Sequence, residues 1–176
     1  MRNYEIHKGQ HSIFGARFRP VLNTGFQSAF CRFDESCRYD IGYYQRNWNK
    51  LIGKTTHGFN PHGNSMRIAW RVVDELDKIE LGLYTYRNGI RQVGEGFAPI
   101  AFCRVDFGEQ FHVHLIHADE VYSATVTRNN GKVYSIQLQA RKAFRIPFPC
   151  VRLNPYFGGN IEAPHDMIIS INHIKQ

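Results

Sequence analysis

The stretch RIAWRVVDELDKIELGLYTYRNG, residues 67–89, decides the fold, because two alternating segments flank a polar connection. Apolar side chains recur at every second position in 67–73 and again in 78–86, which is the period of a strand with one buried face. The connection between them is polar except for Leu76 and predicts a turn. Asn88-Gly89, the commonest signal for a two-residue hairpin, follows the second segment. The stretch therefore predicts consecutive antiparallel strands.

The same period of two continues through most of the chain. It predicts further strands at 98–106, 111–117, 120–128, 132–140 and 166–174, with shorter candidates at 4–14 and 27–33. Asn130-Gly131 marks a second hairpin. The one candidate for a helical turn lies at 46–53 and is too short to anchor a helical domain.

About nine to eleven short strands joined by hairpin turns predict an all-β, antiparallel fold. Residues 34–66 and 141–165 are predicted as long loops that cross the sheet edges, which favours a jelly-roll β-sandwich over a tight up-and-down barrel. The chain has no internal repeat, low-complexity tract or linker, so a single β-sandwich domain is expected over residues 1–176.

Composition agrees with this fold class. Aromatic residues make up 14% of the 176 residues, and aromatic side chains favour strands. The four cysteines form no CxxC pair, which argues against a zinc ribbon and favours reduced thiols over two disulfides. The net charge of +7 predicts either an anionic partner or a solvated basic surface, since the basic residues are scattered along the chain.

Neither export nor membrane insertion is expected from the sequence. The first residues, MRNYEIHKGQHSIFG, contain no apolar core of a secretory signal. No stretch approaches the roughly 20 apolar residues of a membrane-spanning helix. The expected location is cytoplasmic or virion-associated, and extracellular only if a leader has been removed.

The stretch NPYFGGNIEAPHDMIISI, residues 154–171, raises the question whether His165-Asp166 is catalytic. Gly158-Gly159 suits a turn with positive φ, and Pro164 keeps the preceding residue extended. Asp166 then opens an alternating strand. Because neighbours on a strand point to opposite sides, His165 and Asp166 are interpreted as architecture.

A glycine-rich turn, a short loop and a final strand with an acidic residue at its start resemble the C-terminal part of lectin- and glucanase-like (concanavalin A-like) jelly rolls. Residues 69–89 are similar in rhythm to the central strands of that superfamily. The resemblance covers the pattern of most of the chain and includes no diagnostic motif. It implies a structural calcium near the last strand, with Asp166 as the candidate ligand. The alternative is an aspartate that only opens the strand, with no cofactor.

The motif ELDKIE, residues 75–80, has the E-x-D-x-x-E spacing of family 16 glycoside hydrolases. The resemblance to the glucanase-like jelly rolls makes this family a candidate. In that family the two glutamates act as nucleophile and acid from one strand face, about 5 Å apart. Here the polar connection places the first acids in a turn, and Lys78 stands where the family's motif usually has an apolar residue. Catalysis by Glu75, Asp77 and Glu80 is therefore the least favoured hypothesis.

His112 and His114 are two positions apart and share one face of a predicted strand. A metal site would need a third ligand, for which His57 or His62 is the candidate. The favoured alternative is that the two histidines lie on a polar sheet face, where they form hydrogen bonds or contact a ligand.

Several function classes lack their sequence signatures. The chain contains no GxSxG elbow for a serine hydrolase, and neither GxxxxGK[ST] nor GxGxxG for phosphate binding. It also lacks the RNP1 pattern of RNA-binding domains. Nucleic acid is not an expected partner.

A surface remains as the candidate site. If the apolar positions of the strands face the core, one outward face combines arginine, tyrosine, histidine and glutamine side chains. Its members are Arg67, Arg71, Tyr84, Tyr86, His112, His114 and Gln137. Such a face suits sugars or acidic groups, because rings stack and arginines bind carboxylates. The alternative is an ordinary polar face, or outward residues that lie on different sheets.

The favoured function is therefore a non-catalytic, lectin-like binding module for carbohydrate or another anionic ligand. A second hypothesis is a structural or attachment subunit of a viral particle or other assembly, with protein partners, and the missing export signal favours it. The third is a family 16-like glycoside hydrolase. The sequence leaves all three open.

Overall fold

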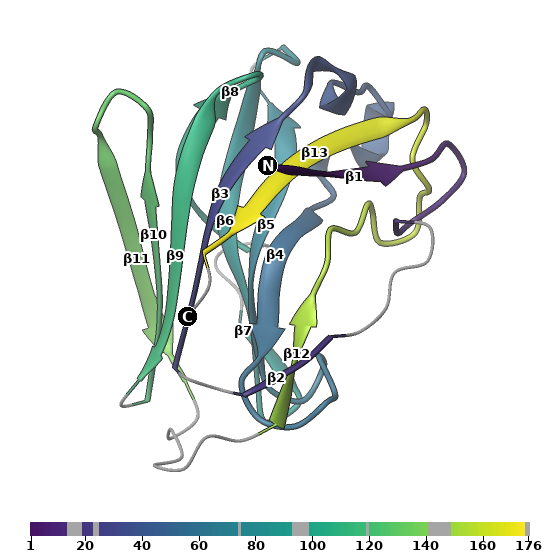
Figure 1. Ribbon diagram of the computed structural model, residues 1–176. Coiled ribbons are helices and arrows are strands. Elements are labelled where there is room, and N and C mark those ends of the chain that lie inside the picture. Colours follow the sequence, from purple (N-terminus) through teal and green to yellow (C-terminus); the bar gives the residue numbers. More distant parts are fainter. Residues whose placement is uncertain are drawn as a thin grey trace.

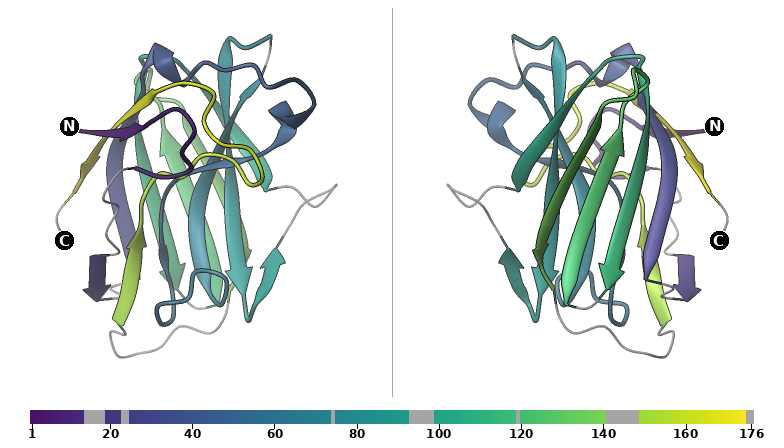
Figure 2. Two further views of the ribbon diagram at one scale, coloured as in Figure 1. Left: turned by 90° about the vertical axis from the view of Figure 1, so that its right-hand side faces the viewer. Right: turned by 90° about the vertical axis from the view of Figure 1, so that its left-hand side faces the viewer.

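The computed structural model describes residues 1–13, 19–22, 25–73, 75–92, 99–118, 120–140 and 149–174. Two antiparallel sheets stack face to face as a β-sandwich (Figures 1 and 2). Sheet A has the order β1 (Arg2–Ile6), β13 (Met167–His173), β3 (Phe26–Phe33), β9 (Gln110–Ala118), β10 (Val121–Thr127) and β11 (Val133–Gln139). Sheet B has the order β2 (Arg19–Leu22), β12 (Pro149–Leu153), β4 (Asn49–Thr55), β5 (Ser65–Val73), β6 (Lys78–Arg87) and β7 (Ile90–Gln92), and β8 (Ile100–Asp106) also pairs with β6. The predicted all-β jelly-roll sandwich is confirmed.

Helical structure is limited to two short 3-10 helices, η1 (Glu35–Cys37) and η2 (Gly42–Arg46), in the part of the chain that the structure describes. Asp34 caps η1, because its side chain accepts a hydrogen bond from the Ser36 amide. No helix among the described residues is both long and apolar enough to cross a bilayer.

The core lies between the two sheets and is built from the alternating positions that the sequence predicts. Trp70 of β5 is fully buried, and its ring centroid lies 4.8 Å from that of Phe33 on β3 of the opposite sheet. The ring of Phe111 on β9 stacks on that of Phe33, with 5.8 Å between the centroids. The predicted inward residues of β5, β6, β9 and β13 are all buried: Ile68, Val72, Ile79, Leu81, Leu83, Val113, Leu115, Met167, Ile169 and Ile171.

Both predicted hairpins form, with different turns. Asn88 and Gly89 have φ of 51° and 81° and make a two-residue turn, since Arg87 pairs with Ile90. The second turn is longer, because the Arg128 amide donates to the Lys132 carbonyl and the three residues 129–131 form the loop. Its glycine, Gly131, has φ of 80°, as a three-residue loop requires.

The prediction of a helical turn at 46–53, within a long loop, is wrong, because residues 49–55 form β4 in the middle of sheet B. The pairing of β4 with β5 shifts register between Lys50 and Gly53, so no regular alternation marks the strand. Leu51 and Ile52 are both fully buried in the core although they are adjacent, because they lie at this bulge, where the alternation of the strand is interrupted. The predicted loop at 141–165 likewise contains β12.

All four cysteines are buried and free, as the sequence predicts. Burial raises the pKa of the Cys31 and Cys37 thiols far above the ordinary range. They behave as small apolar side chains of the core.

An ion-pair cluster joins the two sheets at one end of the sandwich. Arg128, which follows β10, donates to Glu109 and to Asp106 at 2.7 Å each. Glu109 is buried and also accepts hydrogen bonds from the amides of Asp106 and Asn129. Lys78 of β6 donates to Asp106 as well, and this contact holds the pKa of the Asp106 carboxyl below its ordinary value.

Replacing Arg128 by methionine should lower the free energy of unfolding by about 3 kcal/mol, because the buried Glu109 charge loses its partner. Against the effect of burial, the hydrogen bonds from Arg128 lower the pKa of Glu109, so this carboxylate stabilises the fold above the ordinary carboxyl pKa, and the contribution disappears as the pH falls through the lowered value. Thermal unfolding should thus depend less on pH in the acid range in Arg128→Met than in the original protein. Arg104→Met is the control: Arg104 is half-exposed and its partner Glu80 keeps Arg71, so a loss under about 1 kcal/mol is expected. Equal losses in both variants would contradict the structure.

Candidate functional site

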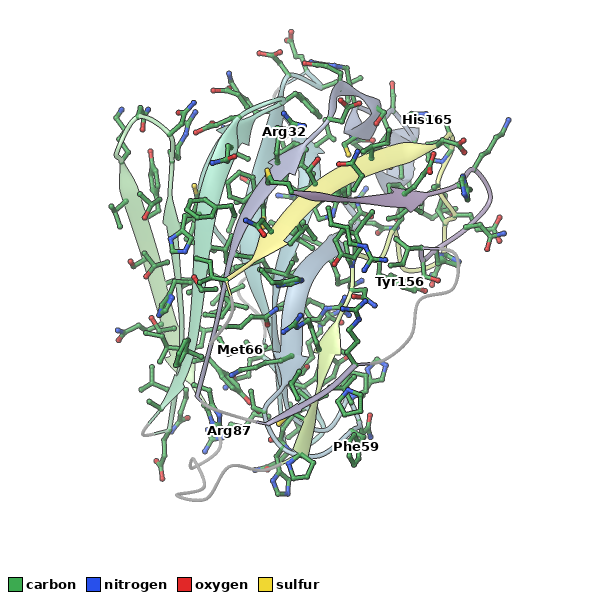
Figure 3. The ribbon with its side chains drawn as sticks, in the orientation of Figure 1. Arg32, Phe59, Met66, Arg87, Tyr156 and His165 are labelled. Atoms are coloured by element: carbon green, nitrogen blue, oxygen red, sulfur yellow. The ribbon has the colours of Figure 1, made fainter. Side chains whose placement is uncertain are left out.

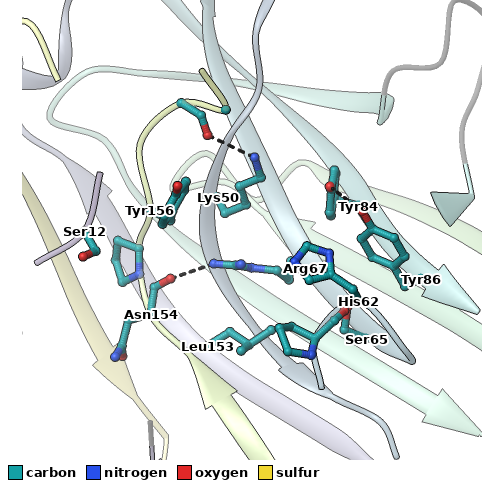
Figure 4. A pocket seen from close by; sticks show the side chains of 14 residues that line it. Ser12, Lys50, His62, Ser65, Arg67, Tyr84, Tyr86, Leu153, Asn154 and Tyr156 are labelled. Carbon is teal, nitrogen blue, oxygen red and sulfur yellow. Dashed lines mark hydrogen bonds between the residues drawn. The ribbon is translucent and has the colours of Figure 1, made fainter. Parts of the chain in front are cut away.

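A cleft with a volume of about 580 Å³, a usual size for a ligand site, lies on the outer face of sheet B. Its floor is formed by β4, β5 and β6, and the segment that follows β12 forms one wall (Figure 4). The lining residues are Ser12, Lys50, Pro61, His62, Ser65, Arg67, Tyr84, Tyr86, Leu153, Asn154, Pro155, Tyr156, Gly158 and Gly159. The set contains no aspartate and no glutamate.

Lys50 enters the cleft from β4. Its Nζ donates to the carbonyls of Trp48 at 3.0 Å and Gly158 at 3.2 Å. The same atom lies 5.2 Å from the ring centroid of Tyr84 and 5.6 Å from that of Tyr156. Burial, together with the positive charge of Arg67, lowers the pKa of Lys50 to about 8. A substantial fraction of this amine is therefore neutral just above physiological pH.

Arg67 projects from β5 beside Lys50 and is partly buried. Its Nη2 donates to the Asn154 carbonyl at 2.7 Å, whereas its Nε is buried and has no hydrogen-bond partner. Burial lowers the pKa of the guanidinium to about 10, so it stays charged at neutral pH. No carboxylate among the described residues forms an ion pair with Arg67 or Lys50. The cleft thus holds two positive charges that no carboxylate of the described residues compensates.

Gly53 makes room for Arg67. A Cβ at this position would lie 2.3 Å from the Met66 carbonyl oxygen and 2.5 Å from Cγ of Arg67. Glycine is therefore required at this position, because any larger residue would overlap the backbone of β5 and the aliphatic part of the Arg67 side chain.

Tyr84 and Tyr86 face the two cations from β6. Their hydroxyl oxygens are 3.4 Å apart, and their rings meet edge to face at 5.7 Å. Burial and the hydrogen bond with Tyr84 raise the pKa of Tyr86 to about 12. Because its pKa is raised, Tyr86 keeps its proton at neutral pH. The His62 ring meets the Tyr86 ring edge to face, with 5.1 Å between the centroids.

Tyr156 closes the wall of the cleft (Figure 4) and is held both by its backbone and by its ring. Its amide and carbonyl exchange hydrogen bonds of 2.9 and 2.8 Å with the backbone of Lys50. Its ring stacks on that of His11 with 5.3 Å between centroids and 6° between planes. His11 is held in turn by a 3.0 Å contact between its Nδ1 and the Phe157 carbonyl. The residues of this wall are therefore preorganised.

Of the residues predicted from the sequence, Arg67, Tyr84 and Tyr86 meet in this cleft. Arg71 lies further along β5, where it donates to Glu80 at 2.6 and 2.9 Å and stacks over the Trp48 ring at 4.5 Å. It does not line the cleft.

The prediction of a single outward face is wrong for its remaining members. His112 and His114 lie on β9, and Gln137 lies on β11, so all three belong to sheet A. The physical reason is topological: β9 pairs with β3 and β10, and not with β6. Alternation fixes which side chains point outward but says nothing about which sheet a strand joins.

The three acids of the glycoside hydrolase motif do not share a strand face. Glu75 and Asp77 are exposed in the turn between β5 and β6, where Glu75 and Leu76 have positive φ. Glu80 is buried on β6 and held by Arg71 and by Arg104, the latter at 3.2 Å. Its carboxylate is therefore occupied by two arginines.

The histidines proposed as metal ligands are also separated. His62 lines the cleft on sheet B, and His112 and His114 lie on the outer face of sheet A. His112 shares a hydrogen bond of 2.6 Å with Ser28 through its Nε2. The structure does not bring these histidines together.

His165 and Asp166 make structural contacts. His165 Nε2 donates to the Ser36 carbonyl at 2.9 Å, near η1 (Figure 3). Asp166 accepts the Lys8 amide at 2.7 Å and lies 3.5 Å from His7 Nδ1. Glu5, His7 and Asp166 offer three ligand atoms within 4.8 Å of one another, all on exposed residues. One imidazole and two carboxylates fit calcium poorly, since calcium takes six to eight oxygen ligands.

Sequence reasoning missed Lys50, Asn154 and Tyr156. All three lie in stretches predicted as loops, and two of them contribute a backbone group as well as a side chain to the site. One signal in the sequence could have indicated Lys50. The apolar pair Leu51-Ile52 lies between Lys50 and Lys54, and a short apolar run of this kind is compatible with a buried strand.

Comparison with known proteins supports the fold. No protein-family model and no curated protein matches the chain. Among solved structures, alginate lyase vAL-1 from Chlorella virus is 13% identical and has a TM-score of 0.58, with 97% of this chain and 81% of that one covered. The alginate lyase from Klebsiella pneumoniae is 9% identical with a TM-score of 0.57, covering 86% of this chain and 59% of that one. A seed lectin from Lotus tetragonolobus is 9% identical with a TM-score of 0.41, covering 92% and 80%. The two lyase structures, with TM-scores above 0.5, show that the chain has a jelly-roll fold like theirs, as the resemblance implied.

Adding a methyl group at Gly53 should disrupt the cleft. Gly53→Ala is expected to lower the free energy of unfolding by about 2 kcal/mol, because the new Cβ overlaps backbone atoms of β5. Denaturant unfolding measures the change. Gly159→Ala is the matched control, since its Cβ would meet nothing within 4 Å, and it should stay within about 0.5 kcal/mol of the original protein. Similar behaviour of the two variants would refute the close approach of β4 and β5.

Proposed function

We propose that the protein binds an acidic polysaccharide in the cleft of sheet B and cleaves it by β-elimination at a uronic acid residue. One observation carries the proposal: no carboxylate among the described residues pairs with Arg67 or Lys50 in the cleft, and the buried Nε of Arg67 finds no acceptor among those residues. A buried cation without a counterion costs free energy that an anionic ligand would recover.

The remaining lining supports a sugar as the carrier of that anion. Tyr84, Tyr86 and Tyr156 offer ring faces and hydroxyl groups around the two cations. Aromatic rings pack against the apolar faces of sugars, and their hydroxyls reach sugar oxygens. A cation binds the carboxylate of a uronic acid, and arginine can do so with two parallel hydrogen bonds.

The pKa values on the two sides of the cleft support a reaction. Lys50 has a lowered pKa and can serve as a base, whereas Tyr86 has a raised pKa and retains a proton to donate. Titratable groups whose pKa values are displaced in opposite directions mark acid and base roles. The proposed roles are Lys50 as base, Tyr86 as acid and Arg67 as the group that neutralises the carboxylate.

In the proposed step, the carboxylate at C5 of the uronic acid binds Arg67, which acidifies the C5 proton. The amine of Lys50 takes that proton, and the C–H electron pair forms the double bond between C4 and C5. The C4–O bond to the next sugar breaks, and the leaving oxygen takes the hydroxyl proton of Tyr86. The products are an unsaturated sugar and a shortened chain, with Lys50 protonated and Tyr86 deprotonated until solvent restores both.

Alginate is the first substrate to test, because two similar solved structures with TM-scores above 0.5 are named alginate lyases. Cleavage creates a conjugated double bond, so the rise in ultraviolet absorbance measures it. Lys50→Met and Tyr86→Phe should each lower kcat by about a hundredfold or more. Lys132→Met and Tyr43→Phe, both exposed and distant from the cleft, are matched controls and should keep full activity. Loss of activity in the controls, or full activity in Lys50→Met, would falsify the assignment.

The reaction should respond to pH in a definite direction. The base must be neutral, so kcat/KM should rise as the pH increases and level off above about 8, the pKa of Lys50. Tyr86 keeps its proton over this range, since its pKa is about 12. A steady-state profile between pH 6 and pH 10, to be corrected for stability, tests this. A rate that falls across pH 8 would assign the base to another group.

A second candidate is a non-catalytic, lectin-like module for the same acidic polysaccharide. The observation in its favour is that Lys50 already donates to two carbonyl groups, which occupy its protons and stabilise the charged form. Binding of alginate without unsaturated product, lost in Arg67→Ala, would support this candidate over cleavage. Absence of binding to alginate and to other polyuronates would remove both candidates.

A further inference from the structure

A ladder of four rings runs along the outer face of sheet A, on the opposite side of the sandwich from the cleft. Phe26 and Phe30 come from β3, and His112 and His114 come from the neighbouring strand β9. Ring centroids are 5.9 Å apart for Phe26 and His114, 6.3 Å for His114 and His112, and 4.9 Å for His112 and Phe30. The rings therefore form a continuous strip of about 13 Å along β3.

The core fixes the direction of this strip. Ala29 and Cys31 of β3 are fully buried, as are Val113 and Leu115 of β9, so the intervening side chains must point outward. Phe26 and Phe30 remain 39% and 36% exposed, which is high for phenylalanine on a flat sheet. The hydrogen bond between Ser28 and His112 holds one ring in place.

The surroundings of the ladder are mostly polar and carry little charge, although the exposed apolar side chain of Ile116 lies beside Phe26. The outward side chains of β9, β10 and β11 include hydroxyl and amide groups at Gln110, Ser123, Thr125, Thr127, Ser135, Gln137 and Gln139. Among the outward positions of β3, β9, β10 and β11, all of which the structure describes, Arg32 alone carries a fixed charge. Burial and the neighbouring His114 lower the pKa of His112, so its ring is neutral at physiological pH. This face differs in chemistry from the cationic cleft of sheet B.

We propose that the outer face of sheet A is a second carbohydrate-binding surface, which takes a neutral polysaccharide chain lying along the four-ring ladder. The proposal does not depend on the activity of the cleft. Exposed rings in a row pack against the apolar faces of successive sugars, and the flanking hydroxyls and amides replace water at the sugar hydroxyls. An acidic polymer would be drawn to Arg67 and Lys50 instead, because the ladder offers it almost no positive charge.

The same composition argues against a second protein chain as the occupant. A stable protein interface needs about 800 Å² on each partner, with an apolar centre and few polar groups in it. Here serine, threonine and glutamine flank the ladder directly, and the ladder is only two strands wide. A narrow aromatic strip between hydrogen-bonding groups suits an extended glycan better than a folded surface.

The test measures co-sedimentation of the full chain with particles of four neutral polysaccharides: cellulose, mannan, xylan and chitin. The double variant Phe26→Ala with Phe30→Ala should bind at least one of them roughly tenfold more weakly than the original protein does. Val133→Ala removes an exposed apolar side chain from the same face but outside the ladder and should leave binding unchanged. Arg67→Ala, in the cleft, should also leave it unchanged, and soluble alginate should not compete.

Four results would overturn the proposal. They are a lack of binding to all four polymers, equal binding by the double variant, loss of binding in Arg67→Ala, and a dimer of the original protein that the double variant dissociates. If the double variant does not fold, by circular dichroism, His114→Ala takes its place, since it removes one ring and keeps both phenylalanines. Because each surface is tested with its own polymer and its own variant, failure of the ladder and failure of the cleft are distinguishable.

Discussion

A β-strand cannot turn one side chain inward without turning its two neighbours outward, and the rest of this molecule depends on that constraint. Burial of Ile68 and Trp70 in β5 requires Arg67 to face solvent, and burial of Leu83 in β6 requires Tyr84 to do the same. Arg67 and Tyr84 are paired across the two strands, so the packing of the core places a cation beside a ring. The cleft is in this sense the outer side of the hydrophobic core.

The cleft also depends on the segment after β12, which forms its wall. The segment after β12 lies against β4 through backbone hydrogen bonds between Tyr156 and Lys50, and it removes water from both cations. Desolvation lowers the pKa of Lys50, and the guanidinium of Arg67 has the Asn154 carbonyl as its hydrogen-bond partner among the described residues. An exposed pair of basic side chains would bind anions weakly, whereas this pair lies where electrostatic interactions are strong. Desolvation of two basic side chains in this way reduces stability locally.

The sequence predicted the fold class, the buried positions and three members of the cleft, because each of these depends on local alternation. Arg67, Tyr84 and Tyr86 belong to two consecutive strands whose pairing follows from one short turn. His112, His114 and Gln137 were assigned to the same face wrongly, since the sheet that a strand joins is decided by long-range pairing. Lys50 was missed because a bulge interrupts the alternation of β4 and two adjacent residues, Leu51 and Ile52, are both buried in the core. Tyr156 was missed because its position depends on backbone bonds between residues more than 100 positions apart.

The strand order of sheet A also has a consequence for how the chain can fold during synthesis. β13 lies between β1 and β3, so the first strand has no partner in the sheet until residues 167–173 have been made. A ribosome will therefore have produced nearly every described residue while one edge of β3 is still unpaired. Completion of the sandwich is then a late event controlled by contacts of very long sequence separation, which fold slowly. Until that moment the open edge of β3 is a site where nascent chains could associate, and a chaperone that shields extended segments would protect it.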